Sequence, residues 1–174
     1  MPENNIHLNL QGIYLQFGGV VALNGLDLDV KKRELLAIIG PNGAGKTSLL
    51  NCINGFYAPK RGTITFASRD ITRIPSHKRA KLGLGRTFQA PQLYHGLTVL
   101  DNIMAGRDPY FNTGMISNAF YLGKARNEEI KHRRMVEDII DFLELEPFRK
   151  LMVGSLSYGL RKRVDLGRAL ALDP

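Results

Sequence analysis

The chain has 174 residues, a formal net charge of +8 and a hydrophobic fraction of 44%, which fit one soluble domain with a sizeable core. A single cysteine, Cys52, excludes an intramolecular disulfide framework, and neither a membrane-spanning apolar run nor a secretory signal is recognisable, so we expect a cytoplasmic protein. The densest basic group, residues 131–134, is surrounded by acidic residues, which favours a solvated helix face over a nucleic-acid-binding patch.

Two segments near the start of the chain alternate apolar and polar residues. Residues 6–10 and 26–30 therefore predict half-buried strands in an antiparallel arrangement. Residues 35–39 differ, because they are continuously apolar and end at Gly40. This pattern is typical of a strand covered on both faces, as in a parallel sheet flanked by helices.

A mixture of short elements is expected next. A helix over residues 46–54 stops at Gly55 and buries Leu49, Leu50 and Ile53. A turn at 59–62 precedes a short strand at 63–66. Residues 78–82 are predicted to be helical, and residues 86–88 are predicted to form a strand.

The rest of the chain has a helical pattern. Thr98 is expected to cap a helix, and residues 107–123 have no clear period and are interpreted as a variable connection. Residues 125–145 predict a long amphipathic helix, and residues 158–172 predict a last helix capped by Ser157.

The strongest motif is a phosphate-binding loop in which glycines, a lysine and a threonine stand at fixed spacing. The glycines let backbone N–H groups point at phosphate oxygens, and the following helix adds its positive end. Lys46 is expected to bridge the β- and γ-phosphates of ATP, and the Thr47 hydroxyl to ligate Mg²⁺. A chance match is disfavoured by the apolar segment before the loop and the predicted helix after it. The predicted nucleotide-binding residues are Gly40, Pro41, Asn42, Gly43, Ala44, Gly45, Lys46, Thr47 and Ser48.

Three further segments resemble the ATP-binding subunits of ABC transporters. Phe17, in Phe-Gly-Gly, resembles the aromatic loop whose ring stacks on adenine, although without that context it reads as a core aromatic. Gln89, in Arg-Thr-Phe-Gln, resembles the glutamine that reaches Mg²⁺ or the attacking water, so the resemblance gives it a catalytic role beside Lys46. The signature motif, which binds ATP held by the opposite subunit, is resembled by Ser157, Tyr158 and Gly159. An ordinary helix cap is the alternative for Ser157.

The residues of these motifs are most similar to those of the branched-chain amino acid importers, with urea and amide importers as close alternatives. The resemblance implies an ATP hydrolase that drives uptake of branched-chain or related amino acids. It also implies a second ATP-binding subunit, in a homodimer or heterodimer, and membrane permease subunits, with a solute-binding protein as an indirect partner. The protein would then lie at the cytoplasmic face of the membrane, with ATP and Mg²⁺ as ligands and no nucleic acid.

The implied fold is an α/β phosphate-loop core with an antiparallel β subdomain and a helical subdomain. We expect the core over residues 1–88, the helical subdomain over 89–160, and a helix returning to the core over 161–174.

Two departures from the family pattern stand out. Leu160 replaces the usual glutamine of the signature, and no Asp-Glu pair follows an apolar strand anywhere in the chain. All four histidines, His7, His77, His95 and His132, precede the signature, so the switch histidine is also missing. We therefore expect a truncated chain, with the C-terminal part of the core missing, that binds ATP without useful turnover. Two other readings are open: a soluble ABC-type ATPase acting in DNA repair or translation, and a binding module without turnover.

Overall fold

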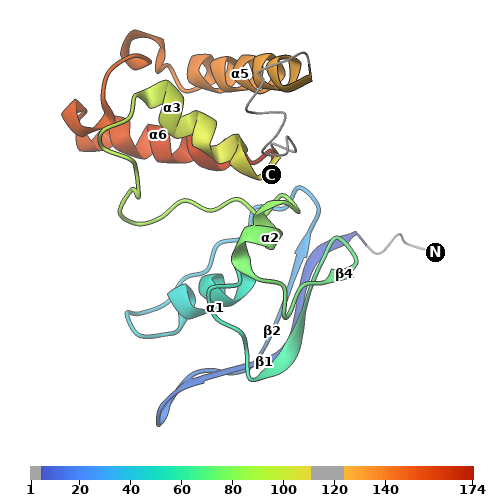
Figure 1. Ribbon diagram of the computed structural model, residues 1–174. Coiled ribbons are helices and arrows are strands. Elements are labelled where there is room, and N and C mark those ends of the chain that lie inside the picture. Colours follow the sequence, from blue (N-terminus) through green and yellow to red (C-terminus); the bar gives the residue numbers. More distant parts are fainter. Residues whose placement is uncertain (1–4, 111–123) are drawn as a thin grey trace. The chain divides into compact units, whose positions relative to one another are not determined.

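The computed structural model describes residues 5–110 and 124–174, with only the backbone of residues 124–129. The chain divides into two compact units, Met1–Arg79 and Ala80–Pro174 (Figure 1). The division predicted from the sequence, with boundaries at residues 88 and 160, stays a prediction.

The first unit is built on an antiparallel sheet of four strands in the order β2-β1-β3-β4 (Figure 1). A hairpin of β1 (Ile6–Phe17) and β2 (Val20–Lys31) confirms the two predicted antiparallel strands, and both extend further than predicted. β3 (Arg61–Phe66) confirms the third strand, and β4 (Arg69–Asp70) is a short addition at the edge.

Helix α1 (Lys46–Ile53) packs its buried side against the apolar face of this sheet. It starts where predicted and ends one residue before the predicted 54, but Leu50 is 42% exposed and not buried as predicted. The second helix of this region, α2 (Ser76–Ala80), begins and ends two residues earlier than predicted. The buried apolar residues of the unit are Leu10, Ile13, Leu15, Leu23, Leu49, Cys52, Ile53, Ile64 and Ile71.

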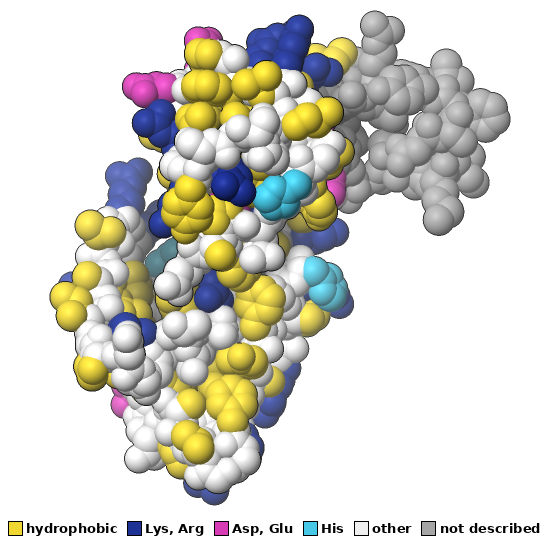
Figure 2. All heavy atoms as spheres, turned by 90° about the vertical axis from the view of Figure 1, so that its left-hand side faces the viewer, with side chains coloured by type: hydrophobic (Ala, Val, Ile, Leu, Met, Phe, Trp, Pro, Cys, Tyr) yellow, Lys and Arg dark blue, Asp and Glu magenta, His cyan; other side chains and the backbone are white. Residues whose placement is uncertain are grey.

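The prediction of a buried strand at residues 35–39 is wrong for this structure. The segment forms no strand, and Leu35 and Ile39 are 99% and 93% exposed. The physical reason is the lack of a backbone partner, because no strand of the described residues pairs with this segment. A continuous apolar run indicates a strand that other elements must pack against on both faces, and the described part of the chain does not supply those elements. Other hydrophobic side chains at the surface can be followed in Figure 2.

A buried arginine, Arg79, bonds to the backbone at the end of α1. The guanidinium of Arg79 donates to the carbonyl oxygens of Cys52 and Ile53 at 2.7 Å each, where α1 ends. It also donates to the carbonyl oxygens of Ile74 at 2.7 Å and Thr72 at 3.1 Å. Arg79 is 2% exposed, so these four bonds replace its hydration.

The second unit is helical within its described residues. Its elements are α3 (Val99–Met104), η1 (Ala105–Tyr110), α5 (Lys124–Phe142), η2 (Glu146–Phe148), η3 (Val153–Ser155) and α6 (Tyr158–Leu170). Thr98 caps α3 as predicted, with its side chain accepting from the N–H of Asp101. The predicted connection at 107–123 begins with 3₁₀ helix, and residues 111–123 lie outside the described residues.

The two long helices of this unit agree with the sequence, except at their ends. α5 stops three residues before the predicted 145, and α6 stops two residues before the predicted 172. They enclose a core with α3, made of Val99, Ile103, Val136, Ile140, Leu145, Val153 and Val164. The predicted strand at 86–88 is wrong: the segment forms no strand, and its Phe88 N–H donates to the side-chain carboxylate of Asp165.

Candidate nucleotide-binding site

The predicted phosphate-binding loop lies at the surface and leads directly into α1. Two of its glycines, Gly43 and Gly45, have φ of +87° and +86°, in the left-handed region that favours glycine. At Gly45 space is short as well, because a Cβ there would lie 2.5 Å from the carbonyl oxygen of Ala22. The loop therefore approaches strand β2 as closely as its backbone allows.

The start of α1 has no capping side chain. Gly45 is the N-cap residue, no side-chain cap bond is formed, and the first turn contains no acidic residue. The first N–H groups of a helix have no partner within the helix, and the helix dipole places partial positive charge there. An anion at this position would accept hydrogen bonds from these N–H groups and balance the partial positive charge.

The side chain of Lys46 is folded over this loop. Its Nζ donates to the carbonyl oxygens of Gly40 and Pro41, at 2.6 Å each. These bonds hold the ammonium beside the start of α1, where the positive charges of lysine and helix reinforce one another. Thr47 is exposed on the first turn of the helix. The local geometry thus presents N–H groups, one ammonium and one hydroxyl at a single surface, which suits a phosphate chain.

Phe17 lies at the end of β1 and is 45% exposed. This exposure disagrees with the alternative that Phe17 is a plain core aromatic. Its Cα partner on β2 is Val20, and Ala22, which contacts Gly45, follows two residues later on that strand. β2 therefore connects the aromatic residue to the phosphate-binding loop within the same unit.

The remaining predicted site residues belong to the second unit: Gln89, Ser157, Tyr158 and Gly159. Ser157 caps α6, and its Oγ accepts from the N–H of Leu160 at 3.4 Å. The next residue, Tyr158, donates its hydroxyl to the carbonyl oxygen of Gln89 at 3.1 Å. The start of α6 is thus bonded directly to the glutamine segment, so the two motifs lie side by side.

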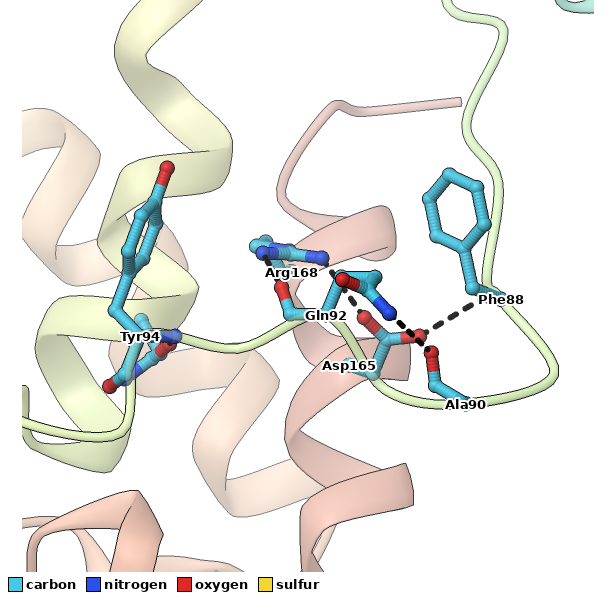
Figure 3. A network of polar contacts seen from close by, with 7 residues as sticks. Phe88, Ala90, Gln92, Tyr94, Asp165 and Arg168 are labelled. Carbon is cyan, nitrogen blue, oxygen red and sulfur yellow. Dashed lines mark hydrogen bonds and ion pairs between the residues drawn. The ribbon is translucent and has the colours of Figure 1, made fainter.

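A buried carboxylate on α6 reinforces this connection (Figure 3). Asp165 is 2% exposed; its Oδ2 accepts from the Phe88 N–H at 3.1 Å, and its Oδ1 pairs with Arg168 at 2.9 Å. Arg168 in turn donates to the carbonyl oxygen of Gln92. The backbone on both sides of Gln89 is therefore held by one face of α6.

Asp165 was not identified from the sequence. Its spacing of three residues from Arg168 is a signal for an ion pair on one helix face, but such pairs usually lie in solvent. Nothing local indicates that the carboxylate is buried against residues 88–92.

Arg86, in the same segment, has its pKa lowered by burial. Cys52, on the buried side of α1, has its thiol pKa raised by burial and lowered to a smaller extent by Arg79.

The described residues contain neither a cluster of metal-binding side chains nor a membrane-spanning helix. No group of three or more His, Cys, Asp or Glu residues in this part of the chain could hold a metal ion. Nor does any helix of the described ranges have the length and apolar character needed to span a membrane. Thr47 and Gln89 stay the Mg²⁺ ligands predicted from the sequence, and both offer oxygen atoms, which this ion prefers.

Comparison with known families agrees with this geometry. The profile of the ABC transporter family matches residues 23–174, which include the phosphate-binding loop and the start of α6. The chain belongs to the ABC transporter family. The resemblance drawn from the motifs is thereby confirmed, and the observed sheet and helices are those of an α/β phosphate-loop ATPase core.

Two relatives within this family illustrate the likeness. The high-affinity branched-chain amino acid transport ATP-binding protein BraF of Pseudomonas aeruginosa is 32% identical over 96% of this chain and 66% of its own length. A probable branched-chain amino acid transport ATP-binding protein, LivG of Methanocaldococcus jannaschii, is 37% identical over 96% of this chain and 64% of its own length. The chain thus spans just under two thirds of each of these ABC relatives.

Solved ATP-binding cassettes of ABC transporters have the same fold. A nucleotide-free cassette superposes with a TM-score of 0.79 at 34% identity, and an ADP conformation of a cassette with 0.80 at 34%. Each comparison covers 97% of this chain and 66% of the solved one.

Proposed function

We propose that this chain binds ATP at residues 40–48. The observation that carries the proposal is the uncapped start of α1, which faces the loop beside an ammonium held by two backbone carbonyl oxygens. Both glycines with positive φ stand where a side chain would strain the loop or strike β2. An anion of phosphate chemistry suits the donors that this arrangement presents.

Each of the other motif residues has a distinct role in the proposal. Phe17 stacks on the adenine, and Thr47 ligates Mg²⁺ through its hydroxyl, with Gln89 contributing its amide oxygen. Lys46 and Gln89 are the catalytic candidates: Lys46 stabilises charge on the phosphates, and Gln89 orients water. Mg²⁺, when bound, neutralises charge that develops on the phosphate oxygens.

The start of α6 acts on a different nucleotide. Ser157, Tyr158 and Gly159 bind the γ-phosphate of ATP held by a second ATP-binding subunit, so that two subunits close around two nucleotides. ATP favours the closed dimer only through contacts that it makes there and not in the separated subunits. The cap geometry of Ser157 and the bond from Tyr158 to Gln89 support this role, because they hold both motifs on one helix start.

The activity of the whole protein is proposed from the relatives. Both relatives above are named as ATP-binding proteins of branched-chain amino acid transport. We therefore assign the whole protein to an importer for branched-chain or related amino acids, in which ATP binding and hydrolysis drive uptake. This chain, in which no Asp-Glu pair follows an apolar strand, binds ATP without useful turnover of its own. Its partners are membrane permease subunits and, indirectly, a solute-binding protein, and its location is the cytoplasmic face of the membrane.

Isothermal titration of the purified chain with ATP and Mg²⁺ tests the nucleotide site. Lys46→Ala removes the ammonium and its charge-assisted bonds to phosphate, each worth about 1.5–3 kcal/mol, so we expect affinity to fall by about 100-fold. Lys32→Ala, at an exposed lysine of the same unit, is the matched control and should bind as the wild type does. Undiminished binding by Lys46→Ala, or none by the wild type, would contradict the proposal.

A further inference from the structure

A second aromatic ring meets Phe17 at the surface of the first unit. The ring centroids of Phe17 and Tyr57 lie 4.9 Å apart, and the ring planes are inclined at 72°, an edge-to-face contact. Phe17 ends β1, whereas Tyr57 follows α1, so folding brings the two together. Both rings stay partly exposed, at 45% and 37%.

The position of Tyr57 is fixed by the end of the same helix that begins at the phosphate-binding loop. Gly55, with φ of +77°, turns the chain after α1, and the N–H groups of Phe56 and Tyr57 then fold back onto the carbonyl oxygen of Asn51. A Cβ on Gly55 would lie 2.8 Å from Nε of Arg79, so only glycine admits the guanidinium that holds this turn. Tyr57 is therefore placed by backbone bonds and not by the aromatic contact alone.

The surroundings of the pair are those of a ligand surface and not of a core. Val20, the strand partner of Phe17, is 70% exposed, so apolar area is grouped around the ring. Ala22, which lies against the phosphate-binding loop at Gly45, is two residues and about 7 Å further along β2. An exposed aromatic at this separation from a phosphate site fits a base, because every base offers a π-face to a ring.

We propose that Tyr57 is a positioning residue for the purine base of the nucleotide, acting through Phe17. The inference rests on the proposed function and extends it to base recognition. Edge-to-face contact restricts the orientation of the Phe17 ring before the nucleotide arrives, so stacking costs less conformational entropy. The phosphates are bound independently by residues 40–48, so Tyr57 affects the base and not the triphosphate.

Isothermal titration with two probes separates these contributions: ATP, which carries the base, and inorganic tripolyphosphate, which does not. Tyr57→Leu keeps apolar bulk but removes the ring, and we expect ATP affinity to fall by about threefold to tenfold. Tripolyphosphate affinity should change by less than about twofold, and Tyr57→Phe should restore ATP binding because it restores the ring. Phe142→Ala, at a 77% exposed aromatic on α5, is the control for loss of a surface ring and should change neither affinity.

A double-mutant cycle tests whether Tyr57 acts through Phe17. In the Phe17→Ala background, Tyr57→Leu should cause no further loss of ATP affinity. Unchanged ATP binding in Tyr57→Leu, or equal loss for both probes, would overturn this proposal and leave the nucleotide site standing. A wild-type chain that binds neither probe would overturn the proposed function and this inference together.

Discussion

Replacing Arg79 tests whether a single guanidinium holds the end of α1. Arg79→Met keeps the length and the apolar stem of the side chain but leaves four carbonyl oxygens, of Cys52, Ile53, Thr72 and Ile74, without this donor. Four bonds at a net value of about 1 kcal/mol each contribute about 4 kcal/mol, and removing the buried charge returns about 1 kcal/mol of its desolvation cost. The free energy of unfolding should therefore fall by about 3 kcal/mol.

Urea denaturation followed by circular dichroism measures this loss. With a urea dependence of about 1–2 kcal/mol/M, the midpoint should fall by about 2 M. Arg79→Lys retains the charge but not the planar fork, so it should recover only part of the stability. Arg73→Met, at an exposed arginine of the same segment, is the matched control. A midpoint for Arg79→Met within experimental error of this control would refute the reasoning.

Three further outcomes follow from the described contacts. Asp165→Asn, which removes the charge paired with Arg168, should lower the free energy of unfolding by about 2 kcal/mol and speed hydrogen exchange at the Phe88 amide; unchanged exchange would contradict the role of the carboxylate. Bonds from the hydroxyl and then the N–H of Thr72 lower the pKa of Asp70. Its stabilising effect is thus present above the unfolded pKa and lost as pH falls below about 4; a pH series of urea midpoints should show this loss in the wild type and less of it in Asp70→Asn. Burial raises the pKa of Cys52, so a thiol reagent should label the native protein slowly at pH 8 and rapidly in urea; rapid native labelling would argue against burial.

Local signals explain most of what the sequence predicted. The caps at Thr98 and Ser157 and the stop at Gly55 depend on a few neighbouring residues, so they can be recognised without knowledge of the fold. Alternation predicted the antiparallel hairpin for the same reason. The phosphate-binding loop was identified from its glycines and lysine, and the structure adds why Gly45 in particular has no side chain.

The misses concern partners that are distant along the chain. The apolar run at residues 35–39 indicates that other elements must pack against it, but the pattern does not identify the strand that would pair with it. Residues 86–88 were predicted to form a strand, whereas the Phe88 N–H donates to Asp165 on α6. Arg79 was not singled out in the sequence, because the four carbonyl oxygens to which it donates converge on it only after folding.

The hydroxyl that caps α6 can donate one hydrogen bond through its hydrogen and accept others through its lone pairs. At Ser157 the lone pairs take the N–H of Leu160, and this role does not use the hydrogen. A phosphate oxygen is only a hydrogen-bond acceptor, so it would bond to the hydroxyl hydrogen, which the helix cap does not use. Capping and phosphate binding therefore do not compete, and a nucleotide could come and go without unwinding the helix. An aspartate here would cap equally well, but with no hydrogen to give and a charge that repels phosphate, it would close the site.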